Sequence, residues 1–246
     1  MRGMVRESEG IKINAIFFDA GETLIHPEPS FTDLFLQVCS CSGFNPTREK
    51  VAFSTGELLR ELEDMQDRGY TFTTSERESR AFWLRFYCRL LEGLGLQGDV
   101  KGLAETLYRT FSDPVNYRIY PDVLPTLREL HADGYVMGVI SNFEPWLVDL
   151  LEDQGVRRYF RTLGISGLVG AEKPQLAIFE WALREAGVEP ARALHVGDSL
   201  RADVEGAHRA GIAPVLLDRH DRHPEPPCAR ISDLRELPEM LRRGGF

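Results

Sequence analysis

The sequence lacks several features that would assign its class at once. No stretch approaches the roughly 18 apolar residues that a membrane-spanning helix needs. The segment Met1–Gly10 is polar and has no apolar core of a signal peptide. The four cysteines, at positions 39, 41, 88 and 228, form no C-x-x-C or C-x-x-H pair, which argues against zinc and a disulfide framework. We therefore expect a cytoplasmic protein that binds no membrane and whose thiols are reduced and mostly buried.

Positive charge is also scarce. The 246 residues include 29 lysines and arginines against 38 aspartates and glutamates, a formal net charge of −9. An acidic surface repels phosphate backbones, so we expect no nucleic-acid partner. The hydrophobic share of 43% suffices for a buried core in a chain of this length, and we expect a monomer or homodimer.

Short apolar runs alternate with amphipathic patterns over most of the chain. The first run, Ile13–Phe18, is nearly continuous and ends at Asp19, which favours a strand buried on both faces. The alternation predicts an α/β fold with a doubly wound, mostly parallel sheet. Further strands are predicted at Val136–Ile140, Ile165–Val169, Ala193–Val196 and Ala213–Leu217, and helices at 121–134, 144–154, 174–186, 201–210 and 234–242.

One long segment, residues 26–116, breaks this alternation. Apolar residues recur there three and four positions apart, which is the spacing of amphipathic helices. A structureless connection of this length is uncommon inside a compact domain. We therefore predict two parts: an α/β core of residues 11–25 and 117–246, and a helical cap of residues 26–116 inserted after the first strand.

The predicted cap contains two candidate contact regions. Phe82, Trp83, Phe86 and Tyr87 have helical spacing, which is typical of packing between helices and leaves about half of them for a pocket. The polar and aromatic segment Gly69–Thr74 is the better candidate for contacting a substrate, because binding residues concentrate in loops.

Polar residues follow the predicted strands at the edge where ligands bind in open α/β sheets. They are Asp19, Ser141, Asn142, Lys173, Asp198 and Asp203. Three carboxylates repel one another unless a cation lies between them, and hard oxygen ligands suit Mg²⁺. With Lys173 and this cation screening the charge, Asp19 can attack phosphorus, which predicts an aspartyl-phosphate intermediate.

In this order, the segments DAGETL, VISN, KP and GDSLRAD resemble the motifs of the haloacid dehalogenase-like hydrolase superfamily. Each motif alone is weak, but four in order at strand ends are specific. The resemblance covers nearly the whole chain and falls in the branch whose helical cap follows the first strand. Within that branch the chain is similar to the haloacid dehalogenase-like hydrolase domain-containing protein 3 group. The resemblance implies a hydrolase that uses Mg²⁺ on a small phosphorylated molecule.

The resemblance also implies a role for each matching residue. Asp19 would be the nucleophile, while Ser141, Asn142 and Lys173 would bind the phosphoryl group. Mg²⁺ would be held by Asp19, the backbone carbonyl of Gly21, Asp198 and, as support behind them, Asp203.

One position departs from the family pattern. Phosphatases of this superfamily carry a second aspartate two residues after the nucleophile, and it protonates the leaving group; here that residue is Gly21. A positioned general acid contributes typically 10²–10⁴-fold, so turnover is expected to be reduced by about that factor unless another acid serves. Glu22 and His26 are the nearby candidates.

Three alternatives to an ordinary phosphatase stay open. A haloacid dehalogenase also lacks the second aspartate, because halide leaves without a proton. A catalytically weak binding or regulatory protein would keep the site but turn over slowly. A phosphonatase would need a cap lysine for a Schiff base, for which the inserted segment offers Lys50 and Lys101.

Overall fold

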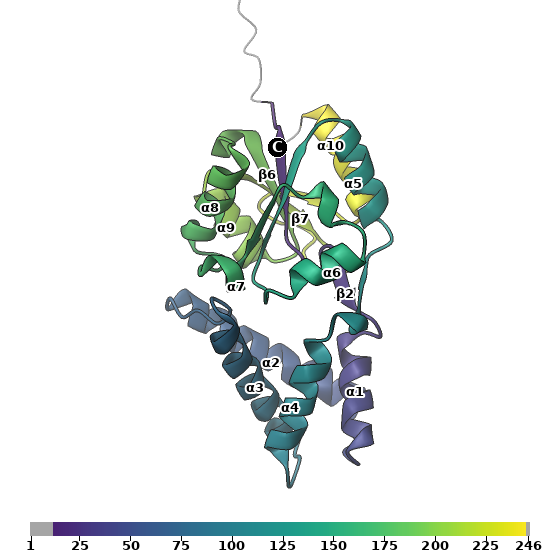
Figure 1. The fold of residues 1–246 in the computed structure, drawn as a ribbon. Helices are drawn as coiled ribbons and strands as arrows, with labels where there is room; N and C mark the ends of the chain where they lie inside the picture. Colours follow the sequence, from purple (N-terminus) through teal and green to yellow (C-terminus); the bar gives the residue numbers. More distant parts are fainter. Residues whose placement is uncertain (1–11, 245–246) are drawn as a thin grey trace, which may run out of the picture.

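The centre of the fold is a six-stranded sheet (Figure 1). The structure, a computed structural model, describes residues 12–244, apart from the side chains of residues 63 and 67. Every neighbouring pair of strands in this sheet is parallel. In spatial order the strands are β5 (Thr162–Ile165), β4 (Val136–Ser141), β1 (Ala15–Phe18), β6 (Ala193–Gly197), β7 (Ala213–Leu217) and β8 (Ala229–Ile231).

This order places a topological switch point between β1 and β6. Counted along the chain, the strands of this sheet follow the order 3-2-1-4-5-6, because the chain moves outward from β1 to β5, returns to β6 and continues to β8. That is the order of doubly wound nucleotide-binding folds, in which ligands bind at the carboxyl ends of the strands beside the switch point. The predicted fold class is confirmed.

Helices cover both faces of the sheet because successive side chains of a strand point to opposite sides. Phe18 belongs to the hydrophobic cluster under α5 (Val123–Ala132), α6 (Leu147–Asp153) and α10 (Leu237–Arg243). Phe17 belongs to the cluster under α8 (Leu176–Ala186) and α9 (Gly206–Arg209) on the opposite face. The sequence predicted these helices within a few residues at most ends. A one-turn α7 (Ser166–Val169) and the short helices η1 (Pro114–Asn116), η2 (Arg157–Tyr159), η3 (Pro190–Arg192), η4 (Leu200–Glu205) and η5 (Leu234–Glu236) complete this part.

A four-helix unit lies beyond the carboxyl ends of the strands (Figure 1). Its helices are α1 (Phe31–Cys41), α2 (Arg48–Asp67), α3 (Glu76–Gly93) and α4 (Val100–Phe111). They bury a hydrophobic cluster of their own, which contains no residue of the sheet. A two-stranded antiparallel pair, β2 (Ile25–Pro27) and β3 (Tyr117–Ile119), connects the unit to the sheet.

Several local predictions are wrong. The segment Ile165–Val169 is not a strand: β5 ends at Ile165, and one helical turn follows and ends at Gly170, whose φ is +77°. The short strands β2, β3 and β8 were not predicted. Only Cys39 among the four cysteines is buried, and Cys41 is exposed.

No helix in the described part of the chain is both long enough and apolar enough to span a membrane.

Candidate active site

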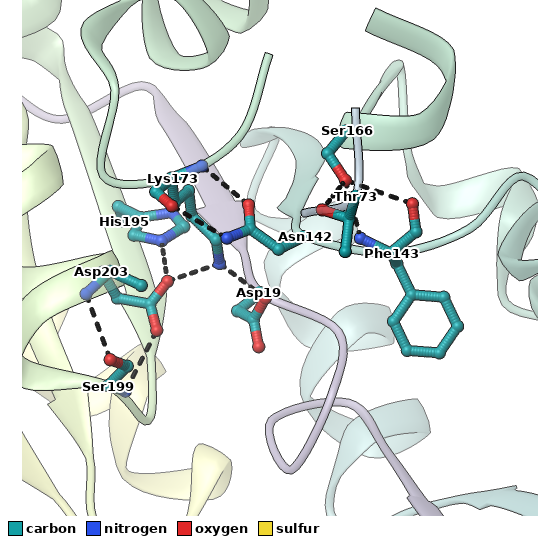
Figure 2. A network of polar contacts seen from close by, with 10 residues as sticks. Asp19, Thr73, Asn142, Phe143, Ser166, Lys173, His195, Ser199 and Asp203 are labelled. Atoms are coloured by element: carbon teal, nitrogen blue, oxygen red, sulfur yellow. Dashed lines mark hydrogen bonds and ion pairs between the residues drawn. The ribbon is translucent and has the colours of Figure 1, made fainter. Parts of the chain in front are cut away.

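Side chains from separate segments meet beside the switch point (Figure 2). Asp19 follows β1 directly, Ser141 is the last residue of β4, and Asp198 follows β6. Lys173 comes from the loop between α7 and α8 and Asp203 from η4. Because parallel strands end at one edge of a sheet, residues 154 positions apart in the chain, Asp19 and Lys173, come into contact here.

The ammonium group of Lys173 joins two of the carboxylates. Its Nζ donates hydrogen bonds to Asp19 Oδ1 and Asp203 Oδ1, both at 2.6 Å, and the residue is only 2% exposed. Asn142 holds the backbone of Lys173: its Oδ1 accepts from the Lys173 N–H at 2.7 Å, and its Nδ2 donates to the Lys173 carbonyl at 2.8 Å. Asn142 thereby positions Lys173, and its contact with substrate stays a prediction.

Asp203 is engaged on both carboxylate oxygens. Besides Lys173, His195 Nε2 lies 2.8 Å from Asp203 Oδ1, and the Ser199 N–H donates to Oδ2 at 3.0 Å. Gly197 permits this close packing, since a Cβ there would lie 2.1 Å from Asp203 Cγ. Sequence reasoning did not identify His195, although a single histidine in an otherwise apolar strand was a usable signal.

Burial and charge act in opposite directions on these groups. Burial alone would lower the pKa of Lys173, but Asp19 and Asp203 raise it to about 12, so the side chain stays an ammonium. Burial, together with the negative charge of Asp203, raises the pKa of Asp19, although the Lys173 ammonium acts to lower it. Burial, together with Asp19 and Asp203, raises the pKa of Asp198 well above its usual value. One ammonium therefore does not compensate three neighbouring carboxylates.

The three carboxylates fit a divalent cation. Asp19, Asp198 and Asp203 each offer an oxygen, and these atoms lie within 4.8 Å of one another. Hard oxygen donors at this spacing suit Mg²⁺, whose charge would offset the excess of negative charge. Because protein donors already occupy both oxygens of Asp203, Asp19 and Asp198 are better placed to bind a metal directly.

The turn after Asp19 brings neither candidate acid into contact with it. Glu22 has a left-handed backbone, with φ of 54°, and its Oε2 accepts a hydrogen bond from Tyr120 at 2.8 Å. The His26 ring packs against the same tyrosine, with ring centroids 4.4 Å apart. Among the hydrogen bonds of residues 12–244, none joins Glu22 or His26 to Asp19. At Gly21 an added Cβ would meet no heavy atom within 4 Å.

The basic loop that begins at Arg219 has a structural role. Arg219 makes a two-pronged ion pair with Asp122, at 2.7 and 3.1 Å, and its guanidinium lies 3.9 Å from the centre of the Tyr120 ring. This contact with Asp122 was not predicted from the sequence.

Two buried glutamates join the sheet to the four-helix unit. Glu172 Oε2 accepts hydrogen bonds from the Phe72 N–H at 2.9 Å and the Thr73 N–H at 2.7 Å. Glu144 Oε1 accepts one from the Tyr108 hydroxyl at 2.9 Å. Sequence reasoning missed both glutamates, because nothing in a local pattern distinguishes them from exposed acidic residues. Phe72 and Thr73 do lie in the Gly69–Thr74 segment that it singled out.

A 3-2-1-4-5-6 parallel sheet with acidic groups at its switch point and an inserted helical unit defines a class of α/β enzymes that act on small molecules. A family model for haloacid dehalogenase-like hydrolase matches residues 13–211. The chain therefore belongs to the haloacid dehalogenase-like hydrolase family, as its motifs predicted.

Some relatives of this chain are named for a specific phosphatase activity, and others only for their family. Bovine haloacid dehalogenase-like hydrolase domain-containing protein 3 is 34% identical over 63% of this chain and 61% of its own length, so the chain spans about six-tenths of that relative. Glyceraldehyde 3-phosphate phosphatase of Methanopyrus kandleri is 29% identical over 94% of this chain and 97% of its own. Phosphoserine phosphatase of Thermus thermophilus is 33% identical over 68% and 70%.

Solved structures share the fold. A HAD-hydrolase from Bacillus subtilis, crystallised with magnesium, superposes with a TM-score of 0.76 at 20% identity and covers 94% of this chain and 99% of its own. At that identity the similarity is one of fold.

Proposed function

We propose that the protein is a Mg²⁺-dependent phosphatase that acts on a small phosphorylated metabolite through a covalent intermediate on Asp19. The observation that carries this proposal is the position of Asp19, whose carboxylate lies against the Lys173 ammonium and within one cluster of three carboxylates. The phosphatase activities named for two relatives support the same reaction type.

The side chains divide the reaction between them. A carboxylate oxygen of Asp19 forms a bond to phosphorus while the bond from phosphorus to the ester oxygen breaks, and the alcohol leaves with a proton taken from water. A second water then attacks phosphorus, which releases phosphate and restores Asp19. Lys173 and the hydroxyl of Ser141 hold the transferring oxygens. Asp19, Asp198 and the Gly21 carbonyl would hold Mg²⁺, which would supply charge neutralisation there, and Asp203 keeps Lys173 in place.

The same proposal makes the four-helix unit the cap of the active site. Residues 26–116 would form the cap, and residues 11–25 with 117–246 the α/β core. The hydrogen bonds from Phe72 and Thr73 to Glu172, one residue before Lys173, support this division because they attach the unit next to the reactive groups.

The test is hydrolysis of p-nitrophenyl phosphate with and without Mg²⁺. We expect turnover that EDTA removes and that Asp19→Asn lowers by at least about 10³-fold, because the nucleophile is lost. Asp149→Asn, an exposed carboxylate on α6, is the matched control and should behave as the unmodified protein. Equal turnover in Asp19→Asn, or none in the unmodified protein on a broad panel of phosphate monoesters, would contradict the proposal.

One observation favours a dehalogenase instead: Gly21 provides no acid, and halide needs none. Activity on a 2-haloacid that survives EDTA would select that reaction. Phosphonatase chemistry has less support, since Lys50 and Lys101 are both exposed on the four-helix unit.

A further inference from the structure

A cavity of about 140 Å³ lies between the four-helix unit and the sheet. Its walls are mostly aromatic and come from both sides, and they include Trp83, Tyr87, Tyr108, Tyr117, Phe143 and Trp146. One water needs roughly 10–15 Å³ of such space, so the cavity can take a small organic group. The sequence predicts that about half of four cap aromatic residues are left for a pocket. Two of these four, Trp83 and Tyr87, line this cavity.

One carboxylate lies in this aromatic wall. Glu144 is only 6% exposed, and its oxygens accept hydrogen bonds from Tyr108 Oη and Trp146 Nε1, both at 2.9 Å, and from Ser112 Oγ at 3.4 Å. All three donors are neutral. Within residues 12–244 no ion pair involves Glu144.

A neighbouring arginine, Arg80, does not neutralise this carboxylate. Arg80 lies 5.6 Å from the centre of the Tyr108 ring, but it donates hydrogen bonds at 2.7 Å to both carboxylate oxygens of Glu105 at the surface. Burial and the hydrogen bond and charge of Glu144 raise the pKa of Tyr108 to about 12, as expected beside an uncompensated negative charge. A buried anion without a cation is costly, and aromatic ring faces attract cations.

The cavity adjoins the reactive groups through Asn142. This residue lines the cavity, and its side chain is hydrogen-bonded to the backbone of Lys173, whose Nζ contacts Asp19. In Figure 2, Asn142 lies between Lys173 on one side and Phe143 and Thr73 on the other, and the latter two also line the cavity. A phosphate ester bound at Asp19 can therefore extend its alcohol portion past Asn142.

We propose that this cavity binds the leaving group of the substrate and selects one that carries an alkylammonium group, whose charge Glu144 and the surrounding rings stabilise. This inference rests on the proposed phosphatase function. It narrows the substrate to phosphate monoesters of amino alcohols, including those methylated on nitrogen.

The test compares 2-(trimethylammonio)ethyl phosphate with its uncharged isostere, 3,3-dimethylbutyl phosphate. We expect the unmodified protein to prefer the cationic ester about tenfold or more in kcat/KM, since the two esters differ only in charge. Glu144→Gln should bring the ratio close to one, whereas the exposed control Glu152→Gln should preserve it. Equal kcat/KM for both esters in the unmodified protein overturns the proposal even if Glu144→Gln does not fold, and so does a preference that survives Glu144→Gln.

Failure of the phosphatase function is separable from failure of this inference. If no phosphate ester is hydrolysed, binding of choline and of 3,3-dimethylbutan-1-ol to the unmodified protein is compared by calorimetry. Tighter binding of choline, weakened in Glu144→Gln, supports an ammonium site without turnover. Equal binding of the two alcohols overturns it.

Discussion

Glu172 Oε2 accepts two hydrogen bonds from Thr73, one from its N–H at 2.7 Å and one from its hydroxyl at 2.8 Å. Glu172 immediately precedes Lys173, and Thr73 belongs to the loop between α2 and α3. One of the contacts that hold the four-helix unit against the sheet is thus made by the residue next to Lys173, whose ammonium group contacts Asp19. Attachment of the unit and placement of the ammonium are therefore coupled.

Removing the charge of Glu172 should weaken this attachment. Hydrogen bonds to a charged group contribute about 1.5–3 kcal/mol, so we expect Glu172→Gln to lower kcat/KM about tenfold or more through loss of the closed arrangement. The measurement is steady-state hydrolysis of p-nitrophenyl phosphate, with the exposed Glu180→Gln as control. If kcat/KM matches that control, the Glu172–Thr73 contact does not hold the active arrangement.

Asp203 should matter for activity although it is not the nucleophile. It shares the Lys173 ammonium with Asp19, and Asp203→Asn removes one of the two charges that hold it. We expect kcat to fall roughly 100-fold, because misplacement of a catalytic group by about 1 Å can cost that much. Steady-state kinetics with p-nitrophenyl phosphate checks this, and Glu205→Gln on the same segment is an exposed control. An unchanged kcat would mean that Asp19 alone positions Lys173.

Gly21→Asp should restore the proton donor that the site lacks. The position has room, since an added Cβ meets no heavy atom within 4 Å. The backbone of Gly21 does not have the positive φ that would strain an aspartate. A positioned acid contributes typically 10²–10⁴-fold where the leaving group needs a proton. We expect kcat on an alkyl phosphate to rise by about tenfold or more, because an unrefined geometry captures only part of that range.

The leaving group provides the internal control for this variant. p-Nitrophenolate leaves without protonation, so its phosphate ester should gain little from Gly21→Asp, and Gly21→Asn should help neither substrate. If kcat rose equally on the alkyl and p-nitrophenyl esters, or rose in Gly21→Asn, the new side chain would not be acting as a proton donor.

The sequence placed the strand-end residues correctly because a parallel sheet leaves little freedom there. Once Ile13–Phe18 and Ala193–Val196 are strands of one sheet, Asp19 and Asp198 must lie at the same edge. The partners His195 and Glu172 escaped prediction. Their roles depend on side-chain contacts between distant segments, such as the contact of Glu172 with Thr73, which is 99 residues away in the chain. A local pattern can mark His195 as unusual in its apolar strand, but it does not reveal the partner of either residue.

The error at Ile165–Val169 has a different physical cause. A short apolar run is compatible with a strand or with a buried helical turn, and periodicity alone does not separate them. Here β5 pairs with β4 only as far as Ile165, and Ser166 then turns inward, where its hydroxyl contacts the Phe143 N–H at 3.0 Å and Thr73 Oγ1 at 2.7 Å. Tertiary contacts, which the sequence does not display, decide the conformation.

Stability should depend on pH through Asp218, which closes the loop after β7. Burial alone would raise its pKa, but hydrogen bonds from the Arg222 and His223 N–H groups and from Arg230 lower it to about 2. A carboxyl group whose pKa is lower in the folded protein than in the unfolded chain stabilises the fold at pH values above the unfolded pKa, which is about 3.8. This stabilisation is lost as the pH falls toward 2.

We therefore expect Asp218→Asn to lower the free energy of unfolding by about 2 kcal/mol at pH 7 and at pH 5, as for hydrogen bonds to a charged group. Urea unfolding of both proteins at pH 7, 5 and 3 measures this difference, with the exposed Glu225→Gln as control. The difference should shrink between pH 5 and pH 3, and one that grew on acidification would mean that the Asp218 carboxylate does not stabilise the loop.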